Sequence, residues 1–143
     1  MLFSPSVKIP FTFAGQSQSK QPMSPKYRSL QAIQAAIANR QTNCSILVEH
    51  YLGKIAASGH LNAYVEVFTE EAIARARELD EKYRTDPSSV GRLFGMVVSI
   101  KDVICYRGHQ VNAASKMLEG FESLYSATVV ERLLAEDAII IGR

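Results

Sequence analysis

The sequence has few cysteines, no long apolar run and no secretory signal. Cys44 and Cys105 are isolated, with no CxxC pair, so they offer no metal or redox motif and fit a reducing cytosol. No apolar stretch approaches the length of a membrane-spanning helix, and no apolar core follows a basic start as in a signal peptide. We therefore expect a cytoplasmic protein that binds no membrane and has no cofactor or metal site on this chain.

Acidic residues are missing from the first third of the chain, where the first is Glu49. The basic residues before it make this segment positive, although the net charge of the whole chain is only +2. A basic, acid-free start is typical of an organelle transit peptide, but four prolines disrupt the amphipathic helix that such a peptide needs. They are Pro5, Pro10, Pro22 and Pro25. We interpret residues 1–28 as a flexible N-terminal tail, with a transit peptide as the alternative.

Residues 29–143 show helical periodicity that alternates with short apolar runs. The expected helix N-caps are Ser29, Thr42 or Asn43, Thr69, and Ser126 or Thr128. Strands are expected over residues 62–68, 96–100 and 138–142. The last two strands, with the helix over 128–136 between them, predict a βαβ unit with adjacent parallel strands. Because a buried strand needs neighbours on both sides, we expect an α/β fold that is incomplete and truncated at residue 143.

A lysine lies at the carboxyl end of a predicted strand, where the functional residues of open α/β sheets are usually found. Lys101 directly follows the strand 96–100, at the carboxyl end that faces the cleft. A lysine held against apolar neighbours loses hydration, so its pKa falls and it can act as a general base. We expect Ser99 to help orient Lys101, and Asp102 to point away toward a backbone or basic group. The alternative is an ordinary solvated Lys-Asp pair at the edge of a loop.

The residues around Lys101 resemble a known family. Residues 93–105, LFGMVVSIKDVIC, are similar to the lysine motif of the amidase signature family. Residues 114–121 (ASKMLEGF) and 125–133 (YSATVVERL) resemble segments of its members that serve as A subunits of glutamyl-tRNA(Gln)/aspartyl-tRNA(Asn) amidotransferases. The resemblance implies that residues 29–143 are the N-terminal portion of an amidase-signature domain, with a mixed sheet flanked by helices.

The same resemblance implies an amide-hydrolysing enzyme with a Ser–cis-Ser–Lys arrangement, in which Lys101 is the catalytic base. For the A subunits of such amidotransferases it further implies glutamine or asparagine as amide donor and conversion of Glu-tRNA(Gln) to Gln-tRNA(Gln). Subunits B and C would be partners, mischarged tRNA would be reached through the complex, and ATP and a metal ion would bind at a partner subunit. The Gly/Ser-rich segment that carries both serines in the family has no counterpart in residues 1–143.

Two other functional interpretations stay open: a stand-alone amidase of the same family, and an inactive truncated fragment. The chain as written has a base without a nucleophile, so we expect residues 1–143 alone to lack glutaminase activity. The unpaired 139–141 strand predicts poor solubility. The family usually has Gly where Asp137 stands, and because Asp tolerates a left-handed backbone we expect the same turn.

The histidines and the residues shortly after Lys101 are weaker candidates for a functional site. His50, His60 and His109 are scattered, so we expect surface or packing roles and no metal cluster. Tyr106 and Arg107 follow Lys101 closely and are expected to border its pocket.

Overall fold

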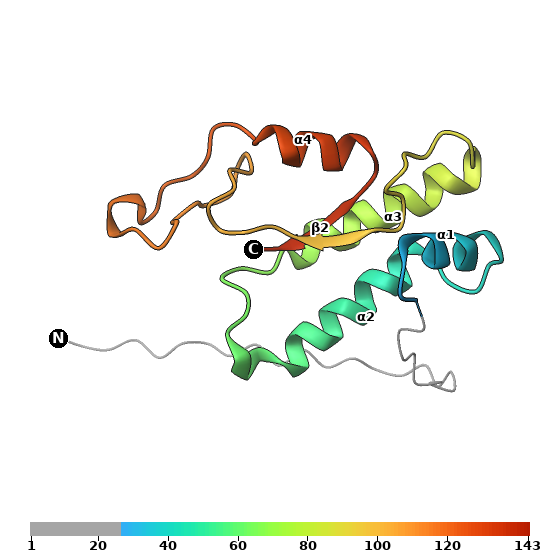
Figure 1. Ribbon diagram of the computed structural model, residues 1–143, viewed down its shortest axis with the longest axis horizontal. Helices are drawn as coiled ribbons and strands as arrows, with labels where there is room; N and C mark the ends of the chain where they lie inside the picture. The colour runs from blue at the N-terminus through green and yellow to red at the C-terminus, as the bar shows by residue number, and fades with distance from the viewer. Residues whose placement is uncertain (1–26) are drawn as a thin grey trace, which may run out of the picture.

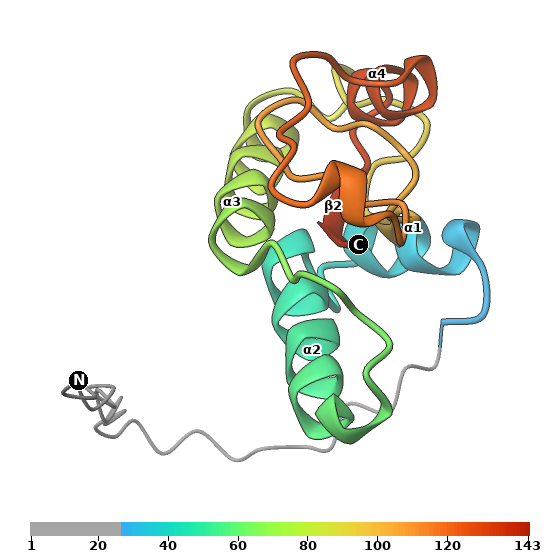
Figure 2. The ribbon, with the colours of Figure 1, turned by 90° about the vertical axis from the view of Figure 1, so that its left-hand side faces the viewer.

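A computed structural model describes residues 27–143. The helices are α1 (Leu30–Ala38), α2 (Cys44–Ala57), α3 (Thr69–Thr85) and α4 (Thr128–Ala135), and the strands are β1 (Val97–Ser99) and β2 (Ile139–Gly142). Short 3-10 turns lie at Gly59–Leu61 and Lys116–Leu118. The two strands lie between α4 on one side and α1 and α2 on the other (Figures 1 and 2). The tail predicted over residues 1–28 lies, except for its last two residues, outside the described part.

The predicted βαβ unit is confirmed. β1 and β2 are parallel neighbours, with Val97 opposite Ile139 and Val98 opposite Ile140. The register shifts after Val98, so that Ser99 pairs with Gly142. Pairing continues one residue beyond β1, where the Ile100 N–H donates to the Gly142 carbonyl at 3.0 Å. The carboxyl ends of both strands therefore meet at one edge, as the sequence predicted.

The regular strand predicted over residues 62–68 is wrong. Among the described residues of this segment only Val67 forms a β-bridge, antiparallel to Gly142. The N–H groups of Val65 and Glu66 both donate to the Arg143 carbonyl, at 2.8 and 3.1 Å. Because two successive donors share one acceptor, a regular ladder cannot form. The segment still lies beside β2, so it closes one side of the strand-end region.

The helix starts are confirmed in part. Ser29 caps α1 by accepting from the Ala32 N–H at 3.2 Å, and Asn43 caps α2 by accepting from the Ile46 N–H at 2.8 Å. The predicted caps of α3 and α4 are wrong, because Thr69 and Thr128 are the first helical residues and the preceding Phe68 and Ala127 make no side-chain cap bond. These two starts are fixed by contacts made far along the chain, since Phe68 is buried and the Ala127 N–H donates to the Cys105 carbonyl at 2.8 Å.

β2 is buried on both faces and divides the core into two clusters. Ile139 and Ile141 pack into the larger cluster with α1, α2 and α3, while Ile140 packs with Phe68 and Val130 on the other face. This alternation follows from the two-residue period of a strand. Burial on both faces is typical of parallel strands and holds the strand ends in a fixed position.

The segment between Lys101 and α4 forms an irregular excursion anchored to α3. Gln110 and Glu122 form an antiparallel bridge at its base. The His109 ring stacks on Tyr106 with centroids 4.2 Å apart, and its Nε2 lies 3.1 Å from Glu71 of α3. The packing role expected for His109 is thus confirmed. Within residues 27–143, no helix combines the length and apolar character needed to cross a membrane.

Candidate active site

Lys101 lies at the strand-end position that the sequence predicted. It lines a pocket of about 370 Å³ at the carboxyl ends of β1 and β2. The pocket is shared with residues 63–65 of the segment beside β2, with Ser99, Ile100 and Asp102, and with Arg143. Residues from three separate stretches of chain therefore surround the lysine, which is the expected setting for a reactive group in an α/β sheet.

The environment of Lys101 differs from the apolar one that we expected. Its side chain is exposed, so residues 27–143 do not dehydrate its ammonium group. Within the same residues, no carboxylate forms an ion pair with its amine. Ser99 lines the same pocket, in agreement with the expected position beside Lys101. Within residues 27–143, Lys101 is thus accessible and forms no ion pair, and it lines a pocket.

Asp102 also lines this pocket and pairs with a basic group, as predicted. Its carboxylate accepts from the Arg143 guanidinium and from the Asn112 N–H at 3.3 Å. Arg143 also donates from Nε to the Glu66 carboxylate at 2.9 Å. Both Asp102 and Arg143 are buried, at 8% exposure each. We call Glu66, Asp102 and Arg143 the strand-end ion cluster.

Sequence reasoning missed Arg143 and Glu66. Arg143 directly follows β2, much as Lys101 closely follows β1, and this parallel placement was the available signal. Tyr106 and Arg107, by contrast, do not line the Lys101 pocket, so that expectation is wrong. The chain turns after Lys101, whose carbonyl accepts from the Ile104 N–H at 2.8 Å, and Tyr106 instead packs near Phe68.

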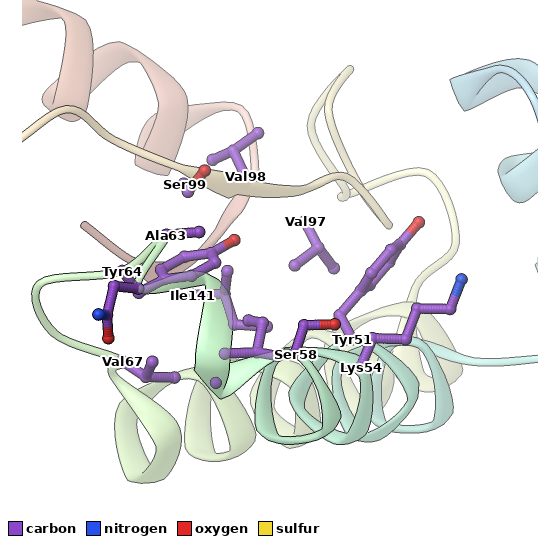
Figure 3. Close-up of a pocket in the computed structure, with 13 residues that line it drawn as sticks. Tyr51, Lys54, Ser58, Ala63, Tyr64, Val67, Val97, Val98, Ser99 and Ile141 are labelled. Atoms are coloured by element: carbon purple, nitrogen blue, oxygen red, sulfur yellow. The ribbon is translucent and has the colours of Figure 1, made fainter.

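A second, larger pocket adjoins the first. It has a volume of about 480 Å³ and lies between α2 and the strands (Figure 3). Tyr51 and Lys54 of α2 face Tyr64, Val97 and Ile141 across it. Ala63, Tyr64 and Ser99 line both pockets, so the two cavities border the same residues.

In the described residues, neither Cys44 nor a metal centre offers an alternative site. Burial, with the nearby Asp80 charge, raises the pKa of the Cys44 thiol, which keeps it protonated. Residues 27–143 contain no group of three or more His, Cys, Asp or Glu side chains placed to hold a metal ion.

The fold and the position of Lys101 define an α/β protein with a strand-end site. A family model described as Amidase matches residues 46–143, and the chain belongs to this family. The lysine-motif resemblance and the fold class predicted from it are therefore confirmed.

Within the family, the chain is similar in sequence to A subunits of glutamyl-tRNA(Gln) amidotransferases. The A subunit of glutamyl-tRNA(Gln) amidotransferase from Chlorobaculum parvum is 40% identical over 118 residues, which is 82% of this chain and 24% of the relative. The protein with the same name from Chlorobium luteolum is 42% identical over 118 residues, again 24% of its length. The chain thus spans about a quarter of the length of these relatives.

Solved structures agree with the fold. The peptide amidase from Stenotrophomonas maltophilia is 28% identical, with a TM-score of 0.74 over 85% of this chain and 25% of that protein. A bacterial aryl acylamidase of the amidase signature family has a TM-score of 0.72 at 22% identity, and covers 80% of this chain and 24% of that one. The arrangement of α1–α4 and the two strands is therefore that of an amidase-signature enzyme segment.

Proposed function

We propose that this chain is the lysine-bearing N-terminal portion of the amide-hydrolysing subunit of a tRNA-dependent amidotransferase, acting in the cytoplasm. The observation that carries the proposal is the 40% identity to the A subunit of a glutamyl-tRNA(Gln) amidotransferase over 82% of the chain. The placement of Lys101 in a pocket at the strand ends supports it. Lys101 is the catalytic residue of the proposal.

Lys101 acts as a general base in this proposal. Its neutral amine accepts a proton from a bridging serine, which in turn takes the proton of a nucleophilic serine. The serine oxygen attacks the amide carbonyl, an acyl-enzyme forms and ammonia leaves. Both serines lie outside the 143 residues of this chain. Lys101 meets one requirement for a base, because its amine is accessible and unpaired within the described residues.

The substrates and partners belong to the same proposal. Glutamine or asparagine donates the amide nitrogen, and subunits B and C complete the complex. ATP and a metal ion bind at a partner subunit, where Glu-tRNA(Gln) is converted to Gln-tRNA(Gln). The Lys101 pocket, about 370 Å³, is in the range of small-molecule sites, which is compatible with a small amide.

Partner dependence separates this proposal from a stand-alone amidase. The protein expressed from its complete reading frame is assayed for ammonia release from glutamine and asparagine, with and without subunits B and C and mischarged tRNA. We expect hydrolysis to depend on the partners. Equal hydrolysis of simple amides without any partner would favour a stand-alone amidase.

The 143-residue chain by itself tests the third interpretation. We propose that it is inactive, because it carries a base and no serine nucleophile of the family type. Purified residues 1–143 should release no ammonia from glutamine above the background of the Lys101→Ala variant. Turnover that depends on one of its own serines would contradict this.

A further inference from the structure

The backbone at Lys101 is held by two hydrogen bonds. One residue before it, the Ile100 N–H donates to the Gly142 carbonyl of β2 at 3.0 Å. The Lys101 carbonyl itself accepts from the Ile104 N–H at 2.8 Å, which closes a turn over residues 101–104. Because this second bond joins the turn only to itself, the turn needs a further contact to stay fixed against the rest of the fold.

The Asp102 side chain supplies that contact. It is only 11% exposed, and its Oδ1 accepts both from Arg143 Nη1 and from the Asn112 N–H, the latter at 3.3 Å. Arg143 follows β2 and also donates from Nε to Glu66, while Asn112 lies in the excursion before α4. One oxygen of Asp102 therefore joins the turn after β1 to the end of β2 and to the excursion. The bond from the guanidinium is charge-assisted and so stronger than a neutral hydrogen bond.

The Lys101 side chain has no ion pair of its own to hold it. It is exposed and pairs with no carboxylate within residues 27–143. A lysine stem is flexible, yet a general base must come within about 2.6–3.2 Å of the group whose proton it takes. The backbone sets the point from which that stem extends, and Asp102 anchors the backbone one residue further along the chain.

We propose that Asp102 is a positioning residue for Lys101. Its side chain anchors the turn, so that the Lys101 amine reaches the serine from which it takes the proton. This rests on the proposed function, because only a residue with a reacting partner needs such a position. Asp102 acts through the backbone and not through its charge. Its loss therefore misplaces the base, and a misplacement of about 1 Å can lower a rate by about 10²-fold.

The test measures kcat and KM of amide hydrolysis in the enzyme expressed from its complete reading frame, with its partners. Asp102→Ala removes Oδ1, so the turn loses its anchor, and kcat should fall by about 10–100-fold. KM should stay close to wild type, because the lost contribution is made in the transition state. The pH dependence of kcat should keep its position, since the base is displaced while its surroundings keep their protonation.

Two matched variants separate anchoring from charge and from stability. Asp102→Asn keeps an oxygen that can accept from both Arg143 and Asn112, because both bonds end on Oδ1, and it should keep kcat close to wild type. A role for the charge predicts that Asn is as poor as Ala. Asp137→Ala removes a buried carboxylate at the other end of β2. Assayed where it is folded, it should retain the wild-type kcat.

A double-mutant cycle with Lys101 tests whether Asp102 acts through the lysine. In the Lys101→Ala background, Asp102→Ala should lower kcat no further, because no amine is left to position. A merely structural role predicts the same loss in both backgrounds.

Three results would overturn the inference: wild-type kcat in Asp102→Ala, an equal loss in both backgrounds, or a kcat in Asp102→Asn as low as in Asp102→Ala. If Asp102→Ala does not fold, Asp102→Leu with Arg143→Met replaces the pair by apolar side chains, which leaves no buried charge unpaired. This variant should lose kcat as well, and wild-type kcat or failure to fold would overturn the inference.

The same measurements distinguish this inference from the proposed function. If Asp102→Ala keeps its kcat while Lys101→Ala loses it, only the inference about Asp102 fails. If Lys101→Ala keeps the kcat of wild type, the proposed role of Lys101 fails instead.

Discussion

The two ends of β2 carry buried ion clusters of opposite sign. Before the strand, the Asp137 carboxylate accepts from Arg75 at 2.9 Å, Lys82 at 2.6 Å and the Gly91 N–H at 2.7 Å. After the strand, the Arg143 guanidinium donates to Asp102 and Glu66. In each cluster a central buried charge is held by two opposite charges, which satisfies the need of a buried charge for partners.

The difference between the clusters lies in their neighbours. Asp137 joins α3, the loop at Gly91 and the turn after α4, at the end of β2 opposite to the Lys101 pocket, so its cluster anchors the fold. The strand-end ion cluster adjoins Lys101 and its pocket. The same arrangement of charges thus lies at both ends of β2, and at the carboxyl end Asp102 and Arg143 line the same pocket as Lys101.

The largest expected effect on stability comes from removing the anchoring charge. Asp137→Ala removes the carboxylate that pairs with Lys82 and leaves Arg75 with only its exposed partner Glu78. It also places Ala, which tolerates a left-handed backbone less well than Asp, at φ 64. Because three charge-assisted hydrogen bonds are lost while the two cations left behind are partly exposed to water, we expect a loss of about 3–5 kcal/mol in the free energy of unfolding. Urea unfolding measures this. Asp137→Gly, which suits the left-handed backbone, should lose less free energy of unfolding than Asp137→Ala. Equal stability of wild type and Asp137→Ala would show that the cluster does not anchor the fold.

A smaller loss of stability is expected from a substitution at Gly142, at the carboxyl end of β2. A Cβ on Gly142 would lie 2.6 Å from the Glu66 carbonyl oxygen, so Gly142→Ala must push residues 62–68 away from the strand. Overpacking of this kind costs about 1–3 kcal/mol, and amide exchange should show loss of protection at Val65 and Glu66. The control is Gly53→Ala within α2, where nothing lies within 4 Å and helix propensity should raise stability. Retained protection at Val65 and Glu66 would contradict the close packing.

The Asp137 cluster should weaken in acid. Burial opposes ionisation of Asp137, but hydrogen bonds from Lys82 and Gly91 and the charges of Lys82 and Arg75 outweigh it, so the pKa of Asp137 lies below its usual value. A carboxyl with a depressed folded pKa stabilises the protein above its unfolded pKa, about 3.9. That stability is lost as pH falls from there through the folded pKa. Unfolding free energies of wild type should therefore fall more steeply below about pH 4 than those of Asp137→Asn; parallel curves would contradict this.

The smallest loss of stability is expected from removing an exposed ion pair beside the Asp137 cluster. Arg92 donates to Glu136 at 3.0 Å, but its side chain is 87% exposed. Exposed pairs gain little because water and salt screen them. Arg92→Ala should therefore leave the urea midpoint close to wild type. A loss as large as that of Asp137→Ala would mean that burial is not what distinguishes the Asp137 cluster.

The sequence predicts local features of this fold better than distant contacts. The period of the apolar residues and the spacing of β1, α4 and β2 are local, so the βαβ unit and the position of Lys101 were predictable. The left-handed turn at Asp137 was predicted too, and is confirmed by its φ of 64. The ion partners of Asp137, Arg75 and Lys82, lie 62 and 55 residues away and left no local pattern.

The wrong predictions, of a regular strand over residues 62–68 and of the caps of α3 and α4, arise from the same lack of information on distant contacts. Residues 62–68 have strand-forming composition, but their pairing with β2 is set by the Arg143 carbonyl, which accepts two successive N–H groups. Thr69 and Thr128 suit helix caps, but packing of Phe68 and the bond from Ala127 to Cys105 fix those helix starts. The pairing of Arg143 with Glu66 joins residues 77 apart, which no pattern in one sequence shows.

The most direct test of the central claim, that Lys101 is the general base, is the kcat of amide hydrolysis for Lys101→Ala in the enzyme expressed from its complete reading frame with its partners. Loss of a general base should lower kcat by about 10²–10⁴-fold. Lys116→Ala, an exposed lysine outside the pocket, is the matched control and should retain wild-type kcat. A Lys101→Ala enzyme with the kcat of wild type would contradict the claim.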